Sequence, residues 1–213
     1  RSAYTYQHVR RGKEAEANAA LAGLSKPADR SGKAPQPAAA DYLRVAEQHA
    51  GTAAAERAQL FAADRLFSEG KPGEAKAQFE QFLRKFSTSP AVPVALLGVA
   101  ACQEASGEVD KAIASYEQAT TQHSDAPEAT QAKFALGLLQ EQKGKPDAAL
   151  RLYDEILRAK HPSVWRAEAE MRREQLVRKH PQLATGTVPT AAPAPATNAP
   201  VAPAKATNAP AKK

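Results

Sequence analysis

GKPDAALRLY, residues 144–153, is the last of three segments that share one spacing, after GKPGEAKAQF at 70–79 and GEVDKAIASY at 107–116. The segments begin 37 residues apart, and four columns in or just after them hold residues of similar kind. Internal repetition with a period of roughly 20–50 residues indicates a protein built of stacked repeats. The columns are Gly70, Gly107 and Gly144; Ala75, Ala112 and Ala149; Phe79, Tyr116 and Tyr153; and Phe82, Ala119 and Ile156.

Each repeat is predicted to hold two helices. Glycine ends the first helix because it adopts the left-handed conformation without a Cβ clash. Pro72 and Pro146 follow two residues later, and proline is favoured in the first turn of a helix. Such short loops make the two helices antiparallel. We expect first helices at residues 53–69, 90–106 and 127–143, and second helices at 73–86, 109–123 and 146–159.

The remaining columns describe the packing between helices. The alanines at 75, 112 and 149 are small where two helices come close, and Ala63, Ala100 and Gly137 have the same role on the first helices. The aromatic residues follow each alanine by four positions and share its helix face. One repeat cannot bury this face alone, so the repeats are expected to stack.

The ends of the chain differ from the repeats. Residues 38–45 resemble the second helix of a degenerate earlier repeat, and residues 163–180 form a polar helix suited to capping the stack. We therefore divide the chain into an N-terminal, juxtamembrane helix (1–24), a linker (25–37), a repeat domain (38–181) and a tail (182–213). The tail is rich in Ala, Pro and Lys, and this composition predicts a disordered, extended segment. A spacer, a bait for a partner and a segment without function all remain open.

The third repeat resembles the tetratricopeptide repeat. Leu136-Gly137, Gly144, Ala149 and Tyr153 match the conserved positions of that family, and the other two repeats match less fully. The resemblance covers about residues 53–159. It implies an all-α, right-handed solenoid of stacked antiparallel helix pairs, and such solenoids bind many different partners.

The sequence contains few residues in an arrangement suited to catalysis or metal binding. Cys102 is the only cysteine, which excludes an internal disulfide, and its apolar helical surroundings favour a buried structural thiol. The histidines do not stand at helical ligand spacing, and no phosphate-binding loop or nucleophile elbow is present. The net charge of +6 comes from acid-free ends, so nucleic acid is not an expected partner. We expect a protein without catalytic residues, cofactor or metal.

The family resemblance points to one surface. In tetratricopeptide stacks the first helices line a concave groove, and their fifth and ninth positions point into it. The subset that grips a carboxy-terminal carboxylate uses Lys, Arg and Asn there, and this groove lacks them. An apolar lining with Asp64, Glu104 and Glu141 near it favours an apolar or mildly basic segment as the ligand. Alternatively, the large fifth-position side chains pack against neighbouring helices. The fifth-position residues are Leu60, Leu97, Phe134 and Met171, and the ninth-position residues are Asp64, Ala101 and Leu138.

The order of the elements is similar to that of the ancillary subunit family of the bacterial SecYEG translocon. Those proteins have one membrane span and a periplasmic tetratricopeptide-like domain, and they assist export and chaperone networks through protein contacts. The resemblance implies protein partners such as translocon subunits or exported polypeptides. It also implies an anchor that precedes Arg1 and a domain located in the periplasm. An envelope-assembly or cell-division protein and a cytoplasmic adaptor are the alternatives.

Overall fold

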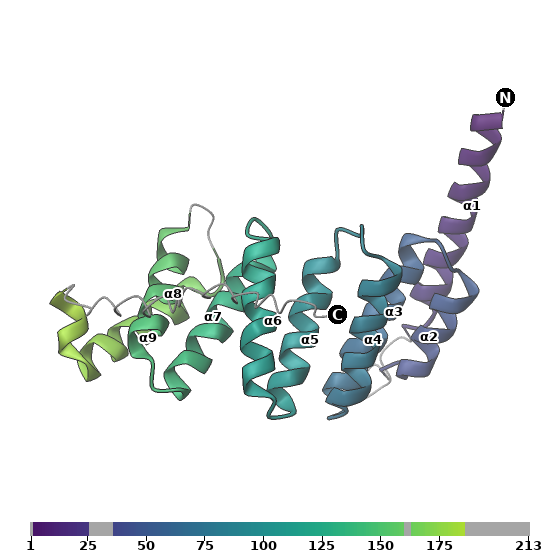
Figure 1. The fold of residues 1–213 in the computed structure, drawn as a ribbon. Helices are drawn as coiled ribbons and strands as arrows, with labels where there is room; N and C mark the ends of the chain where they lie inside the picture. Colours follow the sequence, from purple (N-terminus) through teal and green to yellow (C-terminus); the bar gives the residue numbers. More distant parts are fainter. Residues whose placement is uncertain (1, 26–35, 160–162, 186–213) are drawn as a thin grey trace, which may run out of the picture.

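The computed structural model describes residues 2–25, 36–159 and 163–185, and within these ranges every regular element is a helix. Figure 1 shows the helices side by side in a row, with α1 extending from one end. This arrangement confirms the predicted all-α solenoid. The α-helices are α1 (Ser2–Gly23), α2 (Ala39–Gln48), α3 (Ala53–Ser68), α4 (Pro72–Lys85), α5 (Val92–Ala105), α6 (Val109–Gln122), α7 (Pro127–Gln142), α8 (Pro146–Arg158) and α9 (Arg166–Lys179), followed by the 3₁₀-helix η1 (Pro181–Thr185).

Glycine ends each first helix, as the sequence predicts. Gly70, Gly107 and Gly144 have φ angles of 75°, 74° and 67°. In each turn the next residue donates its N–H to a carbonyl five residues earlier, as Lys71 does to Leu66 at 3.0 Å. This hydrogen bond closes a Schellman motif, which satisfies a carbonyl at the helix end. The same turn therefore aims every second helix back along the first.

Two helices begin later than predicted, and the first of them is α9, which begins at Arg166 rather than at residue 163. Helix α5 begins at Val92 rather than at residue 90. The hydroxyl of Ser89 accepts the N–H of Ala91 at 3.2 Å, and the Ser89 carbonyl accepts the N–H of Val92 at 3.1 Å. Pro90 thus lies in a turn, and Pro93 occupies the first turn of the helix instead.

The core confirms the predicted packing columns. Ala75, Ala112 and Ala149 have no exposed surface, and the aromatic residues four positions later are almost fully buried. Three consecutive hydrophobic clusters fill the stack, each made by side chains from neighbouring helices. Each cluster is completed by the next helix pair, which is why the repeats fold as one stack.

Both ends of the stack are covered by partial units. Helix α2 packs on α3 and places the ring of Tyr42 5.6 Å from that of Phe61. Helix α9 covers the third cluster with Ala169 and Leu176. The described helical structure continues to Thr185, because Leu183 of η1 packs against the same cluster.

Helix α1 is attached through its second half. Ala17 is fully buried, and the carboxylate of Glu14 accepts the N–H groups of Ala53 and Ala54 at 2.9 and 3.0 Å. These donors are unsatisfied at the start of α3, so Glu14 caps that helix. Residues 7–13 are exposed, and the helix projects from the stack (Figure 1).

Two predictions fall partly or wholly outside the described residues: most of the linker, at 26–35, and the tail from residue 186. The described helices include none long and apolar enough to cross a bilayer.

Candidate functional site

The fifth-position residues divide between core and surface. Leu60 and Phe134 are only 8% and 6% exposed. The ring of Phe134 stacks on Trp165 at 5.1 Å and lies 5.8 Å from that of Tyr153. Leu97 is half-buried, and Met171 is 44% exposed. Leu60 and Phe134 are therefore core residues, whereas Leu97 and Met171 remain accessible to a partner.

The ninth-position residues Asp64, Ala101 and Leu138 lie on an accessible stripe. On each first helix, residues that escape burial recur every three or four positions, which places them on one side of the helix. Because α5 contacts both α3 and α7, the three rows form one continuous surface. We call it the open stripe: Arg57, Phe61, Asp64 and Ser68 on α3; Val94, Gly98, Ala101 and Ala105 on α5; and Gln131, Ala135, Leu138 and Gln142 on α7.

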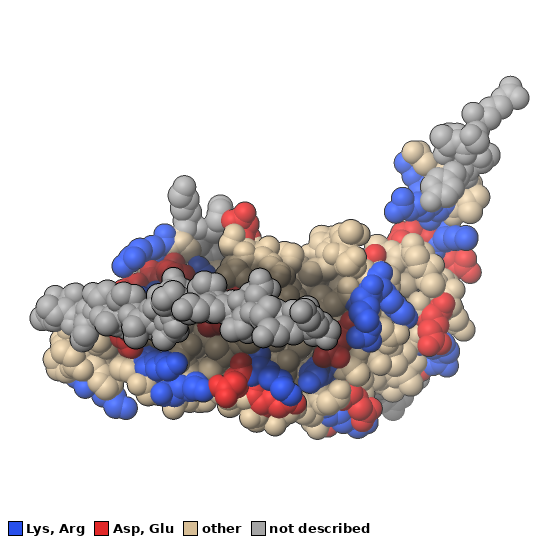
Figure 2. All heavy atoms as spheres, viewed as in Figure 1, with Lys and Arg blue, Asp and Glu red and all other residues tan. Residues whose placement is uncertain are grey.

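The centre of the open stripe is uncharged. Its residues on α5 and α7 are small, apolar or amide side chains, and its two charged residues, Arg57 and Asp64, both lie on α3. Figure 2 shows charged side chains gathered along the lower rim of the visible face. Exposed helix faces are usually charged, so a neutral accessible surface favours contact with an apolar or uncharged ligand.

Two carboxylates beside the open stripe accept hydrogen bonds from buried tyrosines. Tyr116 Oη donates to Glu104 at 2.8 Å, and Tyr153 Oη donates to Glu141 at 2.6 Å. Burial, and then the neighbouring carboxylate, raises the pKa of both phenols well above the ordinary value. The hydroxyls therefore remain protonated donors over the physiological pH range, and they bind the carboxylates that could otherwise attract a cation.

The tyrosine–glutamate pairs were not predicted from the sequence, although the sequence contains their signal. Glu104 and Glu141 stand 37 residues apart, and the corresponding residue of the first repeat is Phe67. In that repeat the aromatic residue is Phe79, which has no hydroxyl. The hydroxyl and the carboxylate are thus present together in the second and third repeats and absent together in the first.

Asp64 differs from these two glutamates. It makes no ion pair or hydrogen bond with any described residue. Its side chain is exposed, yet the surrounding protein removes part of its hydration and raises the pKa of the carboxyl group. Asp64 is therefore an available acceptor at the α3 end of the open stripe.

Gly98 lies where α5 packs closely against α4. A Cβ atom placed on Gly98 would lie 2.5 Å from the ring of Phe79. The residues that correspond to it in the neighbouring repeats are Phe61 and Ala135. The absence of a side chain here lets α5 approach α4, and it leaves backbone accessible to a ligand.

The described residues contain no arrangement typical of a catalytic centre. Cys102 is fully buried, and burial raises the pKa of its thiol to about 11, so little nucleophilic thiolate forms at neutral pH. No group of three or more His, Cys, Asp or Glu in the described ranges could hold a metal ion.

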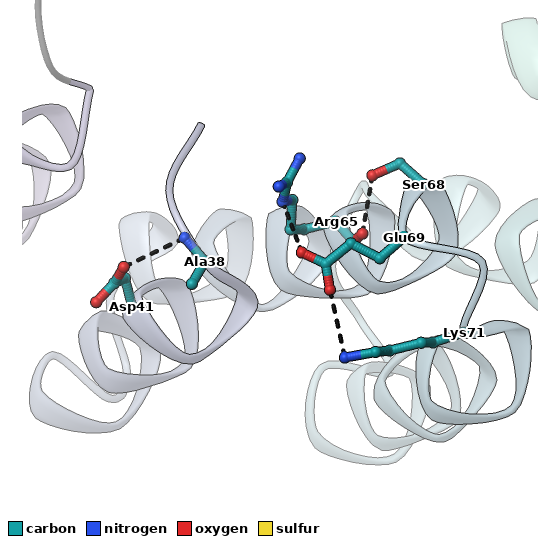
Figure 3. Close-up of polar contacts among 6 residues, drawn as sticks. All are labelled: Ala38, Asp41, Arg65, Ser68, Glu69 and Lys71. Atoms are coloured by element: carbon teal, nitrogen blue, oxygen red, sulfur yellow. Dashed lines mark hydrogen bonds and ion pairs between the residues drawn. The ribbon is translucent and has the colours of Figure 1, made fainter. Parts of the chain in front are cut away.

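A cavity of about 450 Å³ lies where α2 meets α3 and α4. Figure 3 shows its charged edge, where Glu69 pairs with Arg65 at 2.9 Å and Lys71 at 3.5 Å. Across the gap, the N–H of Ala38 donates to Asp41 at 3.2 Å and caps α2. Glu69 and Asp41 already have partners. The cavity therefore has fewer carboxylates available to bind a ligand than it would if they were unpaired, and we favour the open stripe as the site.

A larger cavity, of about 740 Å³, lies beside the start of α7 and the turn before α9. Its wall includes Glu128, Gln131 and Trp165, and Val164 beside it is 89% exposed. Gln131 also belongs to the open stripe, so this cavity extends that surface at the α7 end.

Comparisons with known proteins agree with this architecture. Residues 60–127 and 103–164 match the model of the tetratricopeptide repeat family. Two crystal structures of nearly identical TPR-like repeats from Podosopora anserina, assigned to a kinesin light chain, each align with a TM-score of 0.52 and 16% identity. The alignments cover 82% of this chain and 89% and 90% of those chains. A search of curated proteins finds no match.

At 16% identity the two structures establish the fold alone, and the family model establishes the repeats. Proteins with such repeats generally serve as non-enzymatic scaffolds that bind other proteins. Residues 60–164 of this chain therefore carry tetratricopeptide repeats, and its described helices form a tetratricopeptide-like solenoid.

Proposed function

We propose that this protein is a non-enzymatic scaffold that binds an extended, uncharged segment of a partner protein along the open stripe. The observation that carries the proposal is the row of accessible, uncharged residues that the open stripe has on α5 and α7. Val94 and Leu138 pack partly against the core, and a ligand on the open stripe would bury the rest of their apolar surface together with that of Ala101.

The surface suits a segment with small side chains. Gly98, Ala101 and Ala135 allow close approach of a ligand backbone, while Gln131 and Gln142 offer amide donors and acceptors to its peptide groups. The neutral centre excludes strongly charged ligands, because a charge there would lose hydration without gaining a partner.

We further propose that the scaffold is membrane-anchored and assists protein export or periplasmic chaperone networks. The order of the elements supports this role: a projecting basic helix precedes a linker, a partial repeat and stacked pairs. Arg10, Arg11 and Lys13 on the exposed half of α1 are suited to lie near anionic headgroups.

Site-specific photo-crosslinking in living cells tests both parts of this proposal. A crosslinking side chain is placed at Ala101 or Leu138 on the open stripe, and at Ala114 or Arg151 on the second helices as exposed controls. We expect the same translocon or exported proteins at both stripe positions and none of them at the controls. Equal products at all four positions would rule out the stripe as the binding surface. Recovery of the full gene product in the soluble cytoplasmic fraction would instead support the adaptor alternative.

A further inference from the structure

We infer that residues 186–205 of the same chain occupy the open stripe until a partner displaces them. This inference rests on the proposed function, because it requires the stripe to bind an extended uncharged segment.

The composition of this segment matches that of the surface. Residues 186–204 carry no charged side chain and consist mainly of alanine, proline and threonine. Alanine- and proline-rich segments readily adopt the extended polyproline II conformation, and apolar grooves bind this conformation at a low entropy cost. Small side chains also suit a surface whose centre is made by Gly98, Ala101 and Ala135.

The described chain ends where such a segment would have to start. Leu183 of η1 packs against the cluster that contains Phe134, and Leu138 of the open stripe packs against that cluster too. Helix η1 contacts α9, so the described chain ends at the α9 end of the stack, beyond α7.

The segment is long enough to reach the other end. Neighbouring helices pack about 10 Å apart, so the path from α9 across α7 and α5 to α3 is about 30 Å. A polyproline II helix rises about 3.1 Å per residue, which gives residues 186–204 a reach of about 60 Å. The uncharged segment can therefore cross the whole stripe.

The charges are complementary at the far end. Lys205 is the first charged residue after the uncharged segment, and Asp64 is the unpaired carboxylate of the open stripe. The Asp64 carboxylate has lost part of its hydration, and an ion pair with a lysine would compensate for that loss. Covalent attachment also supplies an effective concentration in the millimolar range, so a weak contact suffices to fill the stripe.

Paramagnetic relaxation in the full chain tests this inference. A nitroxide is attached at Ala204→Cys in a Cys102→Ala background, and amide signals of the ¹⁵N-labelled protein are compared before and after reduction of the label. We expect the signals of Asp64 and Gly98 to lose about half of their intensity or more, because the tethered segment fills the stripe for most of the time. Signals on the exposed faces of α4 and α6 are expected to stay unchanged. Uniform or absent broadening would overturn the inference.

Matched variants separate the stripe from a nonspecific contact. Ala101→Glu places a charge at the centre of the stripe and should abolish the broadening, whereas Ala114→Glu on exposed α6 should preserve it. A melting curve for each variant checks that both remain folded. Broadening that persists in Ala101→Glu would contradict the assignment.

A mixed sample distinguishes binding within one chain from binding to a second copy. In this sample, chains that carry the spin label but no ¹⁵N are mixed with chains that carry ¹⁵N but no spin label. We expect no broadening, and broadening would contradict binding within one chain. The crosslinking experiment reports separately on the proposed function. Stripe crosslinks to a partner without paramagnetic contact would therefore refute this inference alone.

Discussion

At the scale of single residues, glycine has two different roles in this chain. In the turns it supplies a positive φ angle, but at Gly98 and Gly137 it supplies space. A Cβ atom on Gly137 would lie 2.6 Å from the Tyr153 ring, closer than real carbon contacts. The absence of a side chain on Gly137 therefore allows α7 to pack closely against α8.

We predict that Gly137→Ala lowers the free energy of unfolding by about 1–3 kcal/mol, because the added methyl group overpacks the contact with Tyr153. Gly73→Ala on α4 is the control, since a Cβ there meets nothing within 4 Å. Its expected effect is neutral to stabilising, because alanine is the better helix former. Urea unfolding of both variants measures the difference, and equal midpoints would contradict the packing described.

The two buried tyrosines make stability depend on alkaline pH. Their pKa values are raised in the fold, so the folded state holds these protons more tightly than the unfolded state does. The two protonated tyrosines therefore contribute to the free energy of unfolding. Their contribution is complete below about pH 10, the ordinary tyrosine pKa, and is lost as the pH rises above it. We predict that the free energy of unfolding falls above about pH 10, and that the fall is shallower in a Tyr116→Phe, Tyr153→Phe double variant. Urea titrations from pH 7 to 11 measure both slopes, and parallel curves would refute the prediction.

At the scale of elements, α1 is attached to the stack by few contacts. Glu14 receives two N–H groups of α3, the Arg57 guanidinium donates to Asn18, and Ala17 is the fully buried side chain of the described part of α1. The stack itself is held by the hydrophobic clusters, to which α1 does not contribute. Detachment of α1 is thus expected to be a local event.

We predict that Glu14→Ala increases hydrogen exchange of the α1 amides severalfold while the unfolding midpoint changes little, because a lost cap costs about 1 kcal/mol. Glu16→Ala is the control, since Glu16 is exposed on the same helix. The result would go against this view of α1 if both variants exchanged at the same rate.

At the scale of the whole molecule, the last helix completes the core. Trp165 lies 5.1 Å from Phe134, and Leu176 is 4% exposed against the third cluster. Removal of α9 would expose an apolar face that only a following helix can cover. The boundary for a harmless truncation therefore lies after η1, because Leu183 also packs there.

We predict that deletion of residues 186–213 lowers the melting temperature only slightly, because a weakly bound segment adds little stability, whereas deletion of 163–213 lowers it strongly and broadens the transition. The first cut removes none of the residues that form the three clusters, and the second uncovers Phe134 and Tyr153. Differential scanning calorimetry compares the two proteins with the full chain. An unchanged transition after the longer deletion would mean that α9 is not a structural cap.

The fold could be predicted from the sequence because its determinants are local and repeated. Glycine and proline fix each turn by their own backbone preferences, and a spacing of 37 residues displays the same packing column three times. The start of α5 could not be predicted in this way, because the hydroxyl of Ser89 selects a turn there over a further helical turn.

The binding surface required the tertiary structure. A helical pattern shows which residues share a face, but Leu60 and its neighbour Phe61 differ by only one position, and only the neighbouring helices decide which is covered. Trp165, far along the chain, buries Phe134, whereas Ala101 and Leu138 remain accessible. The sequence by itself therefore determined the repeats, their turns and their core columns, and contacts between distant helices decided which side of α3, α5 and α7 stays open.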